Sequence, residues 1–119
     1  MTEQAKKDDK KDGKVGHRYI HPRFKKEVEL AMEAGAVKYS SYDFLKGHTQ
    51  LQLLDALERH LDLYRWGEDI DKDCSDRLGR PVSHLGNMGA CLNMLLAQIE
   101  MGTSVDDRVT KKVINNEKS

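Results

Sequence analysis

Apolar side chains recur at helical spacing in three stretches of the chain, and polar segments separate these stretches. In the first stretch Phe24, Val28 and Ala31 follow one another at i, i+4 and i+7, which places them on one face of a helix. Pro22 suits the first turn of that helix, and Gly35 suits its C-terminal cap. The pattern predicts an amphipathic helix between these two residues.

The second stretch begins at Thr49, and Gln52 three residues later completes a capping-box pattern. It ends at Gly67. The predicted apolar face carries Leu53, Leu54, Leu57, Leu61 and Tyr64.

The third stretch runs from about Ser83 to Met101, and Gly102 ends it. The glycines at 86 and 89 would let another backbone come close. The predicted core stripe carries Leu85, Met88, Leu92, Leu95 and Ile99.

The remaining segments read as connections, so the predicted fold class is all-α. Residues 36–48 suggest a loop or a short irregular helix, residues 67–82 an acidic loop, and residues 104–119 one short helical turn followed by a frayed tail. Three main helices form only a small bundle, and such a core often gains by pairing with a second copy. We therefore expect a homo-oligomer. One domain over 17–108 is predicted, preceded by a disordered charged arm (1–16) and followed by a flexible tail (109–119).

Composition removes several classes of protein. Among 119 residues, 20 are Lys or Arg and 20 are Asp or Glu, so a protein that neutralises many nucleic-acid phosphates is not expected. No apolar run approaches the roughly 20 residues that span a bilayer, so no membrane association is expected. The first residues lack the apolar core of a signal peptide, which favours the cytoplasm. Cys74 and Cys91 are then expected to be free thiols.

Four acids follow Gly67 within six residues: Glu68, Asp69, Asp71 and Asp73. The C-terminal end of a helix carries partial negative charge, so acids placed there need another explanation. A bound cation is one, and ordinary loop polarity is the other. Carboxylate oxygens suit Mg²⁺.

Two histidines border this acidic segment. If the second and third helices form an antiparallel hairpin, the side chains that converge on one cleft are His60, Glu68, Asp71, His84 and Asn87. For each histidine, a structural role as a hydrogen-bonding group at the edge of the core is about as well supported as a functional role in this cleft. Three further acids, Asp55, Glu58 and Asp62, share one face of the second helix and can be ligands or simply its solvated side.

Lys38 can meet a phosphate as a point charge, and Tyr39 can stack on a base. The same segment can equally be a surface loop with its aromatic rings turned into the core.

Four motifs in order resemble the phage MazZ-type dATP/dGTP diphosphohydrolase family, a branch of the all-α, MazG-like nucleoside triphosphate pyrophosphatases. The resemblance covers roughly residues 22 to 108 and rests on Gly35-Ala36-x-Lys38-Tyr39, Arg59-His60, Gly67-Glu68-x-x-Asp71 and His84-Leu85. The chain departs from the family pattern at Ser40 and Asn87, where glycine and a second histidine are common.

The resemblance implies an oligomeric helical enzyme that uses Mg²⁺ or Mn²⁺. It would hydrolyse a (deoxy)purine nucleoside triphosphate to the monophosphate and pyrophosphate, in the cytoplasm of a host cell if the chain is phage-encoded. The implied metal ligands are Glu68 and Asp71; the implied catalytic residues are His60, His84 and Glu58; and the implied substrate-binding residues are Lys38, Tyr39, Arg59 and Asn87.

Two other kinds of protein fit the same residues. One is a non-catalytic protein that keeps the cleft and sequesters a nucleotide. The other is a small helical interaction module in which the acids and histidines are surface and core-edge residues.

Overall fold

The computed structural model describes Gly13 and residues 16–109, and this part of the chain is helical without a strand. The predicted all-α class is confirmed. The predicted arm and tail lie mostly outside the described residues, and the domain boundaries stay a prediction. No described helix is long and apolar enough to cross a membrane. The elements are η2 (His17–Tyr19), α1 (Pro22–Lys38), η3 (Asp43–Leu45), α2 (Gln50–Arg65), α3 (Lys72–Leu78) and α4 (His84–Met101).

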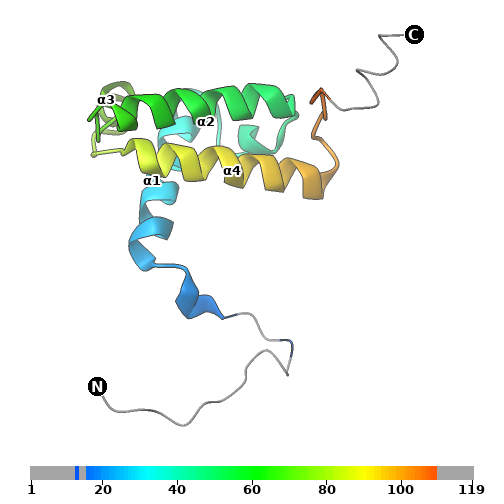
Figure 1. Cartoon of the computed structure of the whole chain (residues 1–119), viewed down its shortest axis with the longest axis horizontal. Helices are drawn as coiled ribbons and strands as arrows, with labels where there is room; N and C mark the ends of the chain where they lie inside the picture. Colours follow the sequence, from blue (N-terminus) through cyan, green and yellow to red (C-terminus); the bar gives the residue numbers. More distant parts are fainter. Residues whose placement is uncertain (1–12, 14–15, 110–119) are drawn as a thin grey trace.

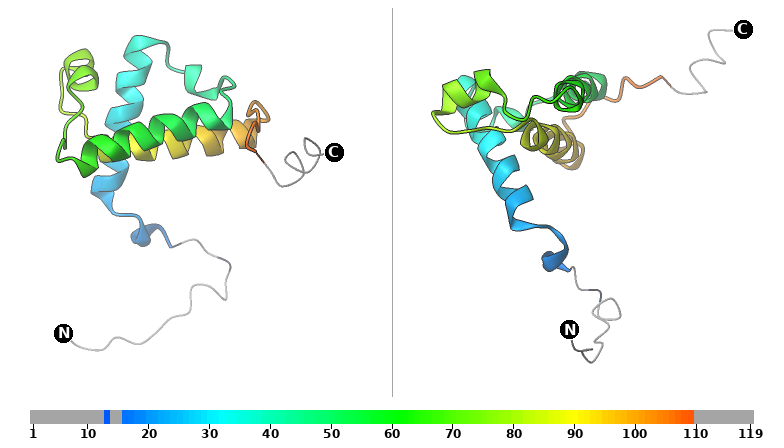
Figure 2. Two further views of the ribbon diagram at one scale, coloured as in Figure 1. Left: turned by 45° about the horizontal axis from the view of Figure 1, so that its top comes forward. Right: turned by 60° about the vertical axis from the view of Figure 1, so that its left-hand side comes forward.

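The helix pair α2 and α4 forms the body of the molecule. The two helices lie side by side and run in opposite directions (Figure 1). Helix α1 crosses this pair at the N-terminal half of α4, and α3 packs against α1 (Figure 2). The end of α2 therefore lies beside the start of α4, as the hairpin prediction requires.

Local capping groups fix the ends of α2 and α4 where the sequence predicts them. The Thr49 side chain accepts from the Gln52 backbone N–H, and the Gln52 side chain accepts from the Thr49 N–H, which makes a complete capping box. Ser83 caps α4 by accepting from the Gly86 N–H. Gly102 ends α4 with φ of 75°, a left-handed conformation that glycine adopts without strain.

The prediction that Gly35 caps the first helix is wrong. Helix α1 continues through Gly35 to Lys38, and the Tyr39 N–H donates to the Gly35 carbonyl. A single glycine inside a helix costs only about 1 kcal/mol relative to alanine, so the packing of α1 outweighs it. Phe24, predicted in the core stripe, is half exposed, whereas Ala31 is buried.

The predicted acidic loop contains a helix of its own, α3. Asp71 is its N-cap residue, because the Asp71 Oδ1 atom accepts from the Cys74 N–H at 3.1 Å. Asp73 lies in the first turn, where the helix dipole favours negative charge. Helix capping therefore accounts for part of the acidic block without a cation.

Residues 103–109 form no helical turn, and the rest of the segment predicted to contain one lies outside the described residues. Val105 instead forms an isolated parallel bridge with Thr49, and the Gln50 N–H donates to the Val105 carbonyl at 2.8 Å. The end of the described chain is thus tied to the start of α2.

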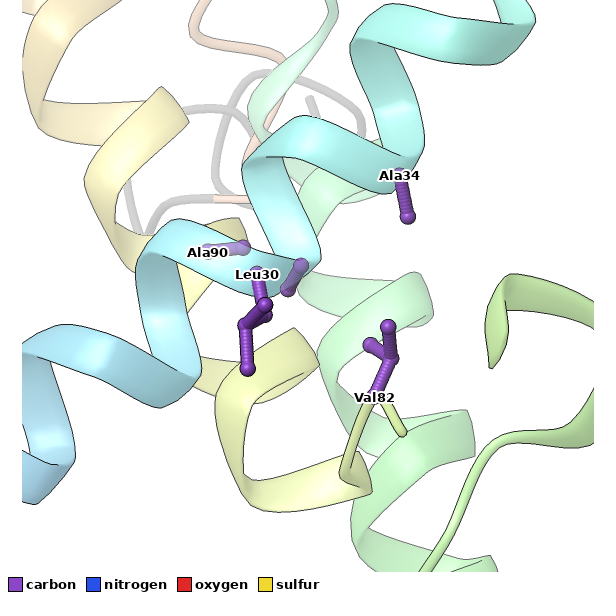
Figure 3. Close-up of a cluster of buried hydrophobic side chains, with 5 residues drawn as sticks. Leu30, Ala34, Val82 and Ala90 are labelled. Carbon is purple, nitrogen blue, oxygen red and sulfur yellow. The ribbon is translucent and has the colours of Figure 1, made fainter. Parts of the chain in front are cut away.

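Small residues bring α1 close to α4. Figure 3 shows Leu30 and Ala34 on α1, Ala90 on α4, and Val82, which precedes α4, gathered in one buried cluster. Gly86 is also buried: a Cβ atom there would lie 2.4 Å from the Glu27 carbonyl oxygen. The expectation that this glycine lets another backbone come close is confirmed.

The predicted core stripe of the third helix is largely wrong. Leu85, Leu92 and Ile99 are 47%, 46% and 50% exposed, because the small residues of α4 face α1 and the large ones turn outward. Beside them lies a groove of about 380 Å³ whose lining includes Phe24 and Leu96. A second chain could cover this surface, so pairing of two copies stays a prediction.

Candidate metal centre

The segments on either side of α3 pair with each other and so bring the end of α2 to the start of α4. Ile70 and Ser83 form an isolated antiparallel bridge. The Asp71 N–H donates to the Val82 carbonyl at 2.8 Å, and the His84 N–H donates to the Asp69 carbonyl at 3.0 Å. These bonds place the acids after α2 next to the first turn of α4.

The two histidines of the site face each other. The His60 and His84 Nδ1 atoms lie 2.9 Å apart, from α2 and α4 respectively. The His84 side chain is only 2% exposed, and its Nε2 atom lies 2.6 Å from the Glu68 Oε2 atom. An ionised carboxylate only accepts hydrogen bonds, so the proton of neutral His84 sits on Nε2, and Nδ1 directs its lone pair at His60.

Asp71 completes the cluster and is itself held by two donors. The Cys74 N–H donates to one oxygen, and the Asn87 Nδ2 atom donates to the other, Oδ2, at 3.0 Å. That second oxygen lies 3.9 Å from the His60 Nδ1 atom. Burial alone would raise the pKa of Asp71, but the hydrogen bonds to Cys74 and the nearby imidazoles outweigh burial and lower it. Asp71 is therefore an ionised carboxylate fixed in place.

Burial lowers the pKa of His60, and the neighbouring His84 adds to the shift. His60 therefore favours the neutral imidazole, which is the form that binds a metal.

Both cysteines are free thiols, as predicted. Burial raises the pKa of each, so neither is a thiolate near neutral pH.

These side chains fit a divalent cation. One ligand atom each from His60, Asp71 and His84 lies within 4.8 Å of the others. Nitrogen ligands sit about 2.0–2.1 Å from a zinc-like ion, so adjacent ligand atoms in a tetrahedral site lie about 3.3–3.4 Å apart. The two Nδ1 atoms are 2.9 Å apart, a hydrogen-bond distance, so the rings would separate by about 0.4–0.5 Å to admit the ion. Two facing imidazole nitrogens need either a shared proton or a cation between them.

The structure brings together five of the predicted site residues: His60, Glu68, Asp71, His84 and Asn87. Their roles stay predictions. Glu68 and Asp71 were the expected metal ligands, but Glu68 is paired with His84. The residues whose ligand atoms converge are two histidines, His60 and His84, and only one acid, Asp71.

Other predicted site residues lie apart from this cluster. Lys38 and Tyr39 are exposed at the end of α1, where the Lys38 Nζ atom lies 5.1 Å from the centroid of the Tyr39 ring. Glu58 is exposed and precedes His60 by two residues, about 200° around the helix. Within residues 16–109, none of these three has a recorded hydrogen bond or ion pair with the cluster. Arg59 is exposed, and its positive charge contributes to lowering the pKa of His60.

A groove of about 520 Å³ is lined by Asp69 and Ser83, the chain neighbours of Glu68 and His84, and by no residue of the cluster itself. Arg23, Phe24 and Tyr64 line it together with Glu27 and Asp69, so it offers one guanidinium, two aromatic rings and two carboxyl groups. The sequence interpretation missed Arg23 as a site residue and placed both rings in the core. The only sequence signal was the position of Tyr64 one turn after His60.

The family model described as "dATP/dGTP diphosphohydrolase, N-terminal" matches residues 4–108. No curated protein and no solved structure matches the chain.

Proposed function

The chain belongs to the dATP/dGTP diphosphohydrolase N-terminal family, and from this membership we propose that it hydrolyses a (deoxy)purine nucleoside triphosphate with the help of a divalent cation. Water would add to the α-phosphorus, the bond to the bridging oxygen would break, and the products would be the monophosphate and pyrophosphate. The observation that carries the proposal is the convergence of the His60 and His84 Nδ1 atoms with the Asp71 carboxylate.

His60, Asp71 and His84 would hold the cation. When bound, it would supply positive charge against the triphosphate and make a nearby water more acidic. In this proposal the two histidines are ligands rather than proton carriers, because His84 is buried and both of its ring nitrogens already have partners. Asn87 and the Cys74 N–H would keep the Asp71 carboxylate aimed at the site.

The groove beside the cluster would receive the nucleotide. The Arg23 guanidinium suits a phosphate, and the rings of Phe24 and Tyr64 suit a purine. The half-exposed Glu68 carboxylate stands next to His84. Its charge would disfavour a triphosphate that carries no cation.

Incubation of the full chain with each NTP and dNTP tests this function. We expect monophosphate and pyrophosphate from purine triphosphates in the presence of Mg²⁺ or Mn²⁺, and no product with EDTA. Ion-exchange chromatography resolves these products. Glu68→Gln should slow the reaction by about 10–100-fold, the usual effect of losing a group that orients a metal ligand.

Glu100→Gln is the matched control, because Glu100 is exposed near the opposite end of α4. Absence of product from every nucleotide and metal would refute hydrolysis. A nucleotide that then raised stability by about 2.7 kcal/mol at a hundredfold excess over Kd would indicate a sequestering protein.

Tyr64→Ala tests the groove separately. Stacking of a base on an aromatic ring is worth about 1–3 kcal/mol, so we expect KM to rise about tenfold with a smaller change in kcat. Steady-state kinetics on the preferred purine triphosphate measures both. Tyr42→Ala, which removes an exposed ring from outside the groove, should leave KM unchanged; an equal effect of both substitutions would count against this groove as the base site.

A further inference from the structure

The donor atoms of the cluster differ from those that magnesium prefers. Mg²⁺ favours six oxygen ligands, usually from one or two carboxylates, phosphates and water. Here two of the three converging ligand atoms are imidazole nitrogens, and only one is a carboxylate oxygen. Imidazole suits ions such as Zn²⁺, Fe²⁺ and Ni²⁺.

His84 is held in the form that a metal ligand requires. Its backbone N–H donates to the Asp69 carbonyl at 3.0 Å, and its Nε2 atom is paired with Glu68 at 2.6 Å. Metal-binding histidines commonly donate their second ring N–H to a carboxylate in this way, which fixes the tautomer and the ring orientation. The Nδ1 lone pair is thus directed at His60 before any ion arrives.

His60 is the adjustable ligand. Since the His84 Nδ1 atom carries a lone pair, the 2.9 Å contact requires His60 to donate its Nδ1 proton in the ion-free chain. An ion between the two rings needs that nitrogen without its proton, which neutral His60 achieves by moving the proton to Nε2. The His60 side chain is 21% exposed, so its ring retains access to solvent.

Asp71 is oriented independently of the histidines. The Cys74 N–H and the Asn87 amide occupy one lone pair on each carboxylate oxygen, and each oxygen keeps further acceptor capacity. A negatively charged oxygen beside two neutral nitrogens gives a compact, mixed nitrogen–oxygen set.

We propose that the cluster of His60, Asp71 and His84 is a site for a first-row transition metal ion, bound in preference to Mg²⁺, with Glu68 as the positioning residue for His84. The inference deepens the proposed function by naming the class of cation at the same site. Metal binding can be measured without turnover, so the two proposals can fail separately.

The experiment uses the full chain after removal of metal with EDTA and dialysis. Co²⁺ is the probe, because its visible absorption reports the ligands directly. We expect one Co²⁺ per chain with a new absorption band, and calorimetry should give affinities for Co²⁺ and Zn²⁺ about 100-fold or more above that for Mg²⁺. The histidine ring signals in NMR spectra should shift on addition of Zn²⁺.

Glu68→Gln should weaken Co²⁺ binding by about 10–100-fold while the absorption band persists, since an orienting group is lost and the ligands remain. Glu100→Gln should leave the affinity unchanged. His60→Ala should remove the band, and the more exposed His60 is a safer target for substitution than the buried His84; circular dichroism verifies the fold.

Equal affinity for Mg²⁺ and Co²⁺, or a band that survives His60→Ala in a folded chain, would overturn the inference. Hydrolysis without binding of any transition metal would overturn it and leave the proposed function standing. A Co²⁺ site in a chain that hydrolyses no nucleotide would support the inference and refute the function.

Discussion

Asp71→Asn is expected to lower nucleotide hydrolysis by about 100-fold or more, while the free energy of unfolding changes by less than about 1 kcal/mol. The large effect follows from the loss of a charged ligand, since even the groups that orient metal ligands are worth about 10–100-fold. The small effect follows because asparagine is as good an N-cap as aspartate, so its oxygen can still accept from the Cys74 N–H. The Asn87 amide can rotate to present its oxygen to the new donor.

Steady-state kinetics and urea unfolding, measured on the same preparation, test this pair of expectations. Asp71→Ala should be equally inactive and about 1 kcal/mol less stable, because it also loses the cap. Asp73→Asn, in the exposed first turn of the same helix, should keep its activity. If Asp71→Asn lost stability and activity in parallel, the lost activity would follow from loss of the fold, and the role of Asp71 as a ligand would be contradicted.

Gly86→Ala is expected to destabilise the fold by about 3 kcal/mol. The new Cβ atom would lie 2.4 Å from the Glu27 carbonyl oxygen and 2.8 Å from its carbonyl carbon, so a backbone has to move. Urea unfolding monitored by circular dichroism should show a lower midpoint with an unchanged slope.

Two other glycines provide graded controls. At Gly89 a Cβ atom would meet side-chain atoms of Val28 and Phe24, which can rotate, so Gly89→Ala should cost less. At Gly35 nothing lies within 4 Å, and alanine inside a helix should stabilise by about 0.5–1 kcal/mol. Equal midpoints for the three variants would mean that α1 and α4 are not in close contact.

The starts of α2 and α4 and the end of α4 could be predicted from sequence because caps are local, whereas α1 runs past Gly35. Thr49 and Gln52 lie three residues apart, and Gly102 directly follows the helix that it ends. The buried face of α4 could not be predicted from hydropathy. Hydropathy gives weight to large side chains such as Leu92, whereas the contact with α1 depends on Gly86 and Ala90, whose small size lets backbones approach.

The meeting of His60 with the acids and His84 was predictable from a helical hairpin alone. Which residues form hydrogen bonds with each other within that cluster could not be predicted. The pairing of Glu68 with His84, and the capping bond of Asp71, depend on the contact between Ile70 and Ser83 across α3. Such a contact joins residues far apart in sequence and leaves no periodic signal. Arg23 reaches the same region only because α1 packs across α4.

Asp71 has a consequence for motion as well as for chemistry. Helix α3 has seven residues, too few to hold its shape by itself, and the Cys74 N–H in its first turn donates to the Asp71 carboxylate, which faces the histidines. Local unwinding of α3 would swing that carboxylate out of the cluster. A cation bound to this carboxylate would favour the folded form of α3 and so slow amide hydrogen exchange at Cys74. The folding of this short helix and the binding of the cation are therefore one coupled equilibrium.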